Sequence, residues 1–250
     1  SITVVELIPE VVAAARLFAD YNLGVLEDKR TQIEIDDARH YLLATDQRFD
    51  VIVADLFVPW ETKTGYLYTV DHYRVAKSRL RSGGLYCQWL PMWQLGEREF
   101  AMIADSMAEV FPQVTLWWCK ARRARSVIAL VGSDGPLRLD TAALDNRLEA
   151  MWRARPERDA QLADAHDIAR LFVGGWRRRA GAPLNTDEHP RIEFGMPVTY
   201  ADERTLTRDT LFAYFQRVLS SLPQEGATFD GQAPPDAADR LHWQSVQLRK

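Results

Sequence analysis

The sequence has few cysteines and no long apolar run. Among its 250 residues only Cys87 and Cys119 are cysteines, and both lie in apolar stretches. This pattern favours reduced core residues over a disulfide. No stretch reaches the roughly 18 apolar residues of a membrane span, and no signal peptide is recognisable. We therefore expect a cytoplasmic chain, with a membrane-tethered parent chain as the open alternative.

The sequence also lacks an excess of positive charge. It has 31 Lys and Arg residues against 35 Asp and Glu residues, a formal net charge of −4. Proteins that bind nucleic acid usually show a basic excess, so we expect no nucleic-acid partner. The five histidines show none of the spacings typical of metal ligands, and no metal site is expected.

A glycine-rich loop of the G-x-G-x type is absent as well. In nucleotide-binding α/β folds this loop follows the first strand and approaches the ligand with its backbone. The chain instead begins at Ser1 with a β-branched run over 2–7. We expect a strand, the loop and a helix upstream of Ser1, and we expect the 250-residue form to be inactive or nearly so.

Strands and helices alternate through the first half of the chain. Apolar runs predict strands at 2–7, 31–35, 50–55 and 85–90, and amphipathic patterns predict helices at 70–80 and 97–111. Residues 114–119 and 126–131 predict an antiparallel hairpin. Alternation of this kind indicates a largely parallel sheet with helices on both faces. The predicted fold is α/β, with a Rossmann-like, methyltransferase-type sheet, a closing antiparallel hairpin and no first βα unit.

The texture of the sequence predicts three parts. Residues 1–135 form the Rossmann-like nucleoside-binding domain, and residues 136–222 form a helical C-terminal extension packed on it. Residues 223–250 form a polar, loosely held tail. Within the extension we expect a turn at 185–188 that leads into a short strand at 191–194; a lid role for this turn is the less favoured interpretation.

Three successive predicted strands end on acids. Glu6 ends the first, Asp37 follows the second, and Asp55 ends the third. Ligands of open α/β sheets bind outside the carboxyl ends of the strands, so these acids predict a ligand site. Glu6 can accept both ribose hydroxyls and Asp37 the adenine amino hydrogens, while Ile8 can pack on the adenine ring. The ligand can be an S-adenosyl compound or a dinucleotide, and Asp55 alone can instead be a turn cap.

Five segments carry a family resemblance through their order and spacing. They read VVELIPEVV at 4–12, IDDARHYL at 35–42, FDVIVADLFVP at 49–59, GYLYTVDHY at 65–73 and SGGLYCQWLP at 82–91. Together they resemble the spermidine synthase (polyamine aminopropyltransferase) family, and most closely its bacterial spermidine synthase-like members. The similarity covers residues 1–132, with a weaker counterpart in PLNTDEHPRIEF at 183–194.

The resemblance implies aminopropyl transfer from decarboxylated S-adenosylmethionine to a polyamine acceptor. It implies that Glu6 holds the ribose, and that Asp37 and Ala38 belong to the adenine-binding motif. Asp55 matches the first, catalytic acid of the family's D-x-x-D signature.

The resemblance also suggests acceptor-side residues and an oligomeric state. Tyr68 follows the family's gatekeeping loop and Gln88 lies on the next strand, so both are predicted to bind substrate. The family likeness implies a homodimer, with apolar surface supplied by Trp117 and Trp118. No tightly bound cofactor is expected, because decarboxylated S-adenosylmethionine or S-adenosylmethionine serves as co-substrate.

Val58 departs from the family pattern. It occupies the place of the second acid of D-x-x-D, which is associated with deprotonation of the attacking amine. An aliphatic amine has a pKa of about 10 and must lose a proton before it attacks, and valine cannot accept that proton. Two alternatives therefore stay open: a methyltransferase that uses S-adenosylmethionine, and a catalytically degenerate binding or assembly module.

Overall fold

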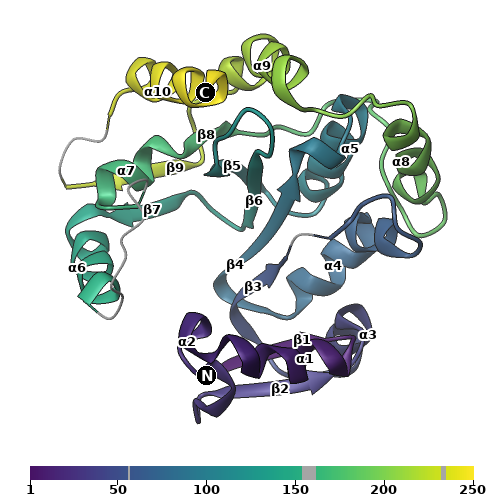
Figure 1. Cartoon of the computed structure of the whole chain (residues 1–250). Coiled ribbons are helices and arrows are strands. Elements are labelled where there is room, and N and C mark those ends of the chain that lie inside the picture. The colour runs from purple at the N-terminus through teal and green to yellow at the C-terminus, as the bar shows by residue number, and fades with distance from the viewer. Residues whose placement is uncertain (56, 154–161, 232–234) are drawn as a thin grey trace. The chain divides into compact units, whose positions relative to one another are not determined.

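The computed structural model describes residues 1–55, 57–153, 162–231 and 235–250. It divides into two compact units, residues 1–48 and 49–250, which differs from the predicted boundary after residue 135. The helices and strands of the first unit are β1 (Ile2–Glu6), α1 (Pro9–Ala15), α2 (Ala19–Asn22), β2 (Thr31–Ile35) and α3 (Ala38–Ala44). Those of the second unit are β3 (Phe49–Ala54), α4 (Val70–Ser78), β4 (Leu80–Pro91), α5 (Glu97–Ala108), β5 (Gln113–Lys120), β6 (Val127–Ser133), β7 (Leu137–Asp140), α6 (Thr141–Arg153), α7 (Ala165–Arg170), β8 (Phe172–Gly175), α8 (Arg191–Ala201), α9 (Arg208–Arg217), β9 (Ala227–Asp230) and α10 (Ala237–Arg249) (Figure 1).

The first unit is built on a two-stranded parallel sheet. β1 pairs with β2 in a register that places Ile2 beside Thr31 and Glu6 beside Ile35. Pro9 is the first residue of α1. An N–H at this position has no partner within a helix, so a proline here costs no hydrogen bond. Both strands therefore end at the same edge of this small sheet, each directly before a helix.

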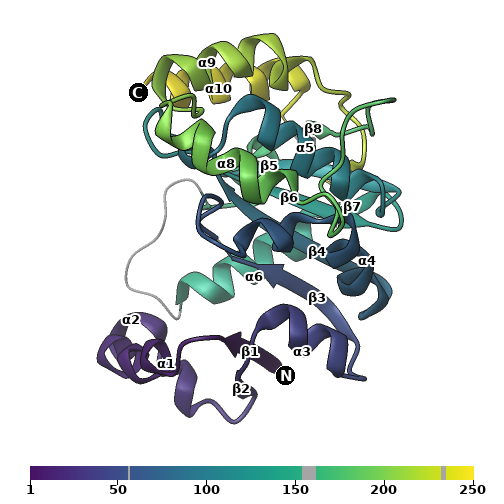
Figure 2. The same cartoon turned by 90° about the vertical axis from the view of Figure 1, so that its right-hand side faces the viewer.

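The second unit is built on a five-stranded mixed sheet in the order β3-β4-β6-β5-β8 (Figure 2). β3 and β4 are parallel, and β4–β6, β6–β5 and β5–β8 are antiparallel. The hairpin predicted at the end of the sheet is confirmed as β5 and β6. The α/β class with a mixed sheet and covering helices is confirmed too.

Aromatic residues fill the layer between α4, α5 and the sheet. His72 and Tyr73 of α4, Tyr86 of β4 and Phe111 after α5 are all buried. The ring of Tyr86 lies 5.6 Å from that of Tyr73 and 5.9 Å from that of Phe111. Burial raises the pKa of both tyrosines well above the ordinary value. This side of β4 is thus covered by buried aromatic side chains of α4 and of the segment after α5.

The opposite side of β3 is open. Val51 and Val53 are 52% and 60% exposed, whereas the apolar run of this strand predicted burial on both faces. In the described residues β3 is hydrogen-bonded to β4 alone. Its alternate residue Ala54 is buried, so the strand has one covered and one open face.

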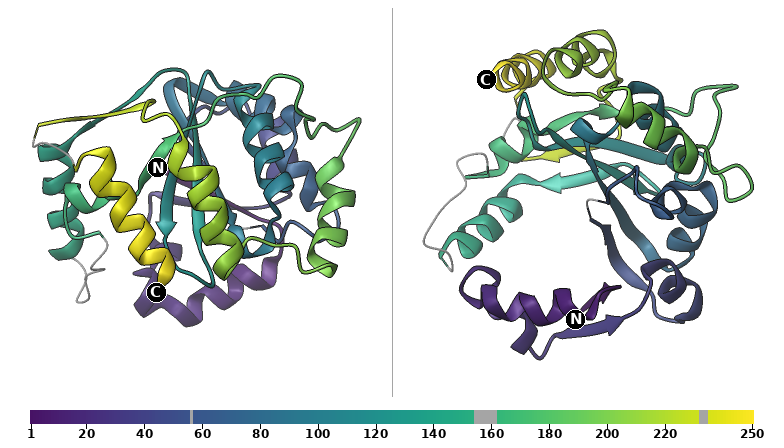
Figure 3. Two further views of the ribbon diagram at one scale, coloured as in Figure 1. Left: turned by 90° about the horizontal axis from the view of Figure 1, so that it is seen from above. Right: turned by 45° about the vertical axis from the view of Figure 1, so that its right-hand side comes forward.

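Residues 223–250 are not the loose tail that composition predicts. β9 pairs in parallel with β7, and α10 packs beside α7 and α9 (Figure 3). The buried stripe of α10 contains Arg240, Gln244 and Leu248. Gln244 Nε2 donates to the carbonyl oxygens of Arg170 and Phe172, at 2.9 Å each. The polar composition of this region suggested an exposed tail. The structure instead buries two of these polar side chains in α10, where they are hydrogen-bonded to backbone groups.

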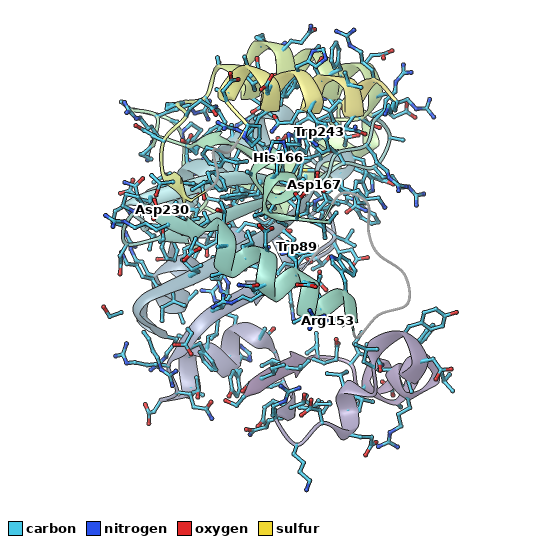
Figure 4. The ribbon with its side chains drawn as sticks, turned by 90° about the vertical axis from the view of Figure 1, so that its left-hand side faces the viewer. Trp89, Arg153, His166, Asp167, Asp230 and Trp243 are labelled. Carbon is cyan, nitrogen blue, oxygen red and sulfur yellow. The ribbon has the colours of Figure 1, made fainter. Side chains whose placement is uncertain are left out.

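The surroundings of α10 are visible from the other side of the molecule. Figure 4 labels Trp243 of α10 and His166 and Asp167 of α7, two helices that pack together, and Asp230 at the end of β9. No helix among the described residues is both long enough and apolar enough to cross a membrane.

Two further expectations about the C-terminal half need correction. Residues 191–194 begin α8 instead of forming a strand; Ile192 and Met196 are spaced four residues apart and are both buried. The hairpin tryptophans supply little free apolar surface, since Trp118 is buried and Trp117 is half-buried. Trp118 is fully buried near Phe215, and Trp117 packs on Phe172 with ring centroids 5.0 Å apart. The homodimer stays a prediction, without this support.

The burial of the two cysteine thiols can be tested through their reactivity. Burial raises the pKa of Cys87 to about 11 and that of Cys119 to about 12, and both are free thiols. The reactive thiolate therefore forms in the folded chain only at strongly alkaline pH, whereas an unfolded cysteine ionises near pH ~8.5. We expect Ellman's reagent at pH 8 to label the native protein at least about a hundredfold more slowly than the guanidinium-unfolded chain. Two thiols that react at once in the native protein would contradict this burial.

Candidate functional site

Two of the predicted nucleoside-binding acids lie at one edge of the first unit. Because β1 and β2 are parallel, Glu6 and the residues after Ile35 leave the sheet on the same side. The Asp36 N–H donates to the Glu6 carbonyl oxygen at 3.2 Å, which ties the two strand ends together. The structure thus brings Glu6 and Asp37 to one edge, as the strand pattern predicts.

Glu6 is oriented by its own backbone. Its Oε1 accepts a hydrogen bond from the Ile8 N–H at 2.9 Å. An ionised carboxylate has about four lone-pair sites, so one contact leaves capacity for hydroxyl donors. The Ile8 side chain is 50% exposed, a position from which an apolar side chain can pack on a flat ring.

Asp37 is the N-cap of α3, a role that the sequence interpretation missed. Its Oδ1 accepts from the N–H groups of Arg39 at 2.8 Å and His40 at 3.0 Å, and Ala38 is the first helical residue. Such a cap stabilises a helix by about 1 kcal/mol. An aspartate placed directly before a helical pattern is the sequence signal that identifies it. Capping by Oδ1 fixes the direction of the carboxylate, and ligand binding by Asp37 stays a prediction.

Asp55 belongs to the second unit. It follows Ala54, the last residue of β3, and its side chain is exposed. This is the carboxyl end of a parallel strand, where the α/β rule predicts ligand contacts. The catalytic role of Asp55 stays a prediction.

Tyr68 and Gln88 are packed inside the second unit. Both are fully buried, and burial raises the pKa of the Tyr68 hydroxyl well above its ordinary value. Tyr68 Oη donates to the Phe57 carbonyl oxygen at 3.4 Å. The Gln88 amide accepts from Tyr86 Oη at 3.1 Å and donates to the Trp89 carbonyl at 3.4 Å. Their substrate-binding roles stay predictions, and the contacts shown here belong to the core.

Contacts from residues 185–200 were not foreseen. Thr69 Oγ1 donates to Asp187 Oδ1 at 2.8 Å, and the Trp60 ring stacks on Tyr200 with centroids 4.6 Å apart. Residues 57–69, the segment that follows Asp55, are thus contacted by a part of the chain more than 100 residues later. The segment PLNTDEHPRIEF at 183–194 carried the signal, but its interpretation as a turn and strand hid these contacts.

Cavities do not identify the site by themselves. Three cavities of about 620, 670 and 660 Å³ lie in the second unit. The first is lined by residues 121–124 of the β5–β6 tip, Arg208 of α9, and Gln247 and Lys250 at the end of α10, and the other two lie along α5. None of the residues that line these three cavities is a predicted site residue. The strand-end acids remain the better guide because they combine position with chemistry.

Comparison with known proteins places these residues in a family domain. Residues 1–134 match the model of the Spermine/spermidine synthase domain. Polyamine aminopropyltransferase 2 of Hyperthermus butylicus is 26% identical over 159 residues, which cover 62% of this chain and 52% of that protein. The polyamine aminopropyltransferase of Aeropyrum pernix is 33% identical over 98 residues, 38% of this chain and 31% of that protein. The chain thus spans about half, or less, of the curated relatives it matches.

The solved structures similar to this chain include a probable spermidine synthase and a methyltransferase-like protein. A probable spermidine synthase from Corynebacterium glutamicum is 24% identical, with a TM-score of 0.48, over 74% of this chain and 63% of that one. Human methyltransferase-like protein 13 in complex with SAH is 18% identical, with a TM-score of 0.42, over 63% and 72% of the two chains. The family model, which covers residues 1–134 of 250, is the decisive match: the chain belongs to the spermine/spermidine synthase family.

Proposed function

We propose that the chain binds the nucleoside of decarboxylated S-adenosylmethionine and belongs to a protein of aminopropyltransferase type. One observation carries this proposal. Within the matched domain, Glu6 ends β1 and Asp37 lies two residues after the end of the adjacent parallel strand β2, and each carboxylate accepts at least one hydrogen bond from a backbone N–H group. Two oriented acceptors at such an edge suit the ribose hydroxyls and the adenine amino group.

The proposed reaction needs a neutral amine. The amine lone pair forms a C–N bond to the aminopropyl carbon attached to the sulfonium sulfur. The C–S bond breaks, its electron pair stays on sulfur, and methylthioadenosine leaves. The amine proton passes to a base. Asp55 is the proposed acid on this side, and Val58 provides no second carboxylate, so slow aminopropyl transfer is expected.

Val58 is the observation that favours a second candidate. Methyl transfer from S-adenosylmethionine to an acceptor without an ammonium group needs no acid at this position. The released nucleoside distinguishes the two reactions, since methyl transfer yields S-adenosylhomocysteine and aminopropyl transfer yields methylthioadenosine. A degenerate binding module releases neither. The homodimer and the cytoplasmic location are part of the proposal and rest on the family likeness.

The nucleoside assignment is tested by titration calorimetry of the full-length protein with methylthioadenosine. We expect saturable binding, and we expect Glu6→Gln to weaken the Kd about tenfold or more because charge-assisted bonds to the ribose are lost. Glu10→Gln is the matched control, since Glu10 is an exposed acid of α1 in the same unit. Absence of any heat with the unsubstituted protein would exclude the nucleoside assignment.

The role of position 58 is tested by Val58→Asp. Val58 is half-buried and its carbonyl oxygen accepts from the Glu61 N–H at 3.0 Å, a main-chain contact that the substitution retains. We expect diamine-dependent release of methylthioadenosine to rise by roughly 10²-fold, the lower range for a positioned general base. Val58→Asn is the control of similar size without a base. Equal turnover in the two variants would show that position 58 does not limit this chemistry.

A further inference from the structure

The segment after Asp55 takes several of its backbone hydrogen-bond partners from a distant part of the chain. Residues 57–69, here called the loop segment, contain one short 3₁₀ helix at Thr64–Tyr68. Two turns add hydrogen bonds from the Glu61 N–H to the Val58 carbonyl at 3.0 Å and from the Thr64 N–H to the Glu61 carbonyl at 3.2 Å. Backbone groups of an irregular, partly buried segment need partners from elsewhere. The loop segment obtains them from residues 185–200, here called the clasp.

Glu193 of the clasp binds two backbone N–H groups of the loop segment. Its Oε1 accepts from Lys63 N at 2.6 Å and its Oε2 from Gly65 N at 3.0 Å. Both oxygens of one carboxylate are thus used on adjacent turns of the chain, 130 and 128 residues away in sequence. Hydrogen bonds to an ionised acceptor are about twice as strong as those between neutral groups.

Asn185 of the clasp is fully buried, and each of its four polar atoms has a hydrogen-bond partner. Its N–H donates to Ser106 Oγ at 2.9 Å and its carbonyl accepts from Val70 N at 2.9 Å. Its side-chain Nδ2 donates to the Gly65 carbonyl at 2.8 Å, and its Oδ1 accepts from Ile192 N at 3.1 Å. The residue therefore links the loop segment, the start of α4, α5 and α8. A buried polar group of this kind fixes one arrangement, because any shift leaves several groups without partners.

Close packing accompanies these bonds. A Cβ added at Gly65 would lie 2.5 Å from Glu193 N and 2.7 Å from Glu193 Cα. Only glycine lets the two backbones approach so closely. α8 packs against the 3₁₀ helix of the loop segment (Figure 1), and the Trp60–Tyr200 stack covers the other end of the contact.

We propose that the clasp positions the loop segment, with Glu193 and Asn185 as its positioning residues. The clasp lies outside residues 1–134 that match the family domain, yet it contacts the loop segment between Trp60 and Thr69. The positions of Asp55 and Val58 depend on how firmly the chain that follows them is held. The consequence for catalysis rests on the proposed function; the contact itself does not.

The clasp should act on the acceptor amine and leave the nucleoside side unchanged. Glu6 and Asp37 are oriented by bonds within the first unit, and none of these bonds involves the clasp. Loosening the loop segment should therefore raise the KM for the diamine several-fold and leave the Kd for methylthioadenosine unchanged. A residue that only stabilises the fold would not separate the two constants.

Hydrogen exchange measured by mass spectrometry reports directly on the backbone N–H groups that the clasp binds. Glu193→Ala removes both acceptors, and we expect peptides within 57–66 to exchange about tenfold faster, as loss of about 1.4 kcal/mol of protection gives. Glu188→Ala is the matched control, because Glu188 is an exposed acid of the same segment. Glu193→Gln keeps the shape of the side chain and one acceptor, so the exchange rate in this variant should lie between that of Glu193→Ala and that of the Glu188→Ala control. Peptides of the β5–β6 hairpin should not change in any variant.

A substitution on the opposite side of the contact tests the same idea without changing charge. Gly65→Ala should also accelerate exchange in the loop segment, because the added methyl group displaces Glu193. Gly135→Ala is the control, since a Cβ at Gly135 meets no atom within 4 Å.

The outcomes separate the clasp from the proposed function. Unchanged exchange in both Glu193→Ala and Gly65→Ala overturns the clasp, whatever the activity. Faster exchange with an unchanged diamine KM overturns its positioning role. Faster exchange with a raised diamine KM supports it. If the unsubstituted protein neither binds methylthioadenosine nor turns over, the proposed function fails, and the exchange result alone decides whether the clasp holds the loop segment.

Discussion

Backbone groups removed from water must be hydrogen-bonded, and the second unit meets this constraint partly through side chains of its C-terminal region. Strands meet it through the sheet, but the loop segment at 57–69 does not. Glu193 and Asn185 provide the missing partners across more than 100 residues of sequence. The same solution recurs where Gln244 of α10 binds two carbonyl oxygens at the edge strand β8. Polar side chains from the C-terminal region thus complete backbone that the earlier elements leave unpaired.

The parts of the fold that local sequence specifies were predictable. The runs at 31–35, 50–55 and 85–90 and the hairpin at 114–131 form strands, because their patterns match a pleated, buried surface. α10 was missed because its buried stripe includes Arg240 and Gln244, which look like surface residues until their backbone partners are known. α8 was missed because four residues, RIEF, are too short to distinguish a strand from the first turn of a helix. Burial of polar side chains depends on distant contacts, which local patterns do not carry.

In the candidate site, too, features set by local sequence could be predicted, and features set by distant contacts could not. The convergence of Glu6 and Asp37 could be predicted, since adjacent parallel strands end at one edge. The N-cap of Asp37 was also within reach of the sequence. The full burial of Tyr68 and Gln88 was not, because it arises from packing of the 3₁₀ helix and α4 against β4. A residue type that suits a substrate pocket suits an aromatic core equally well.

The two sides of the proposed chemistry are therefore supported in different ways. The nucleoside side relies on bonds that span two or three residues, such as Glu6 with Ile8 and Asp37 with His40. The acceptor side relies on bonds between 63–71 and 185–193 that span from 115 residues (Val70 with Asn185) to 130 residues (Lys63 with Glu193). These short-range hydrogen bonds form whenever the ends of β1 and β2 form, so they belong to the matched domain itself. Long-range support depends on residues beyond that domain, and changes there can alter the acceptor side while the nucleoside side stays intact. Val58 and the contacts of the clasp both lie on the proposed acceptor side.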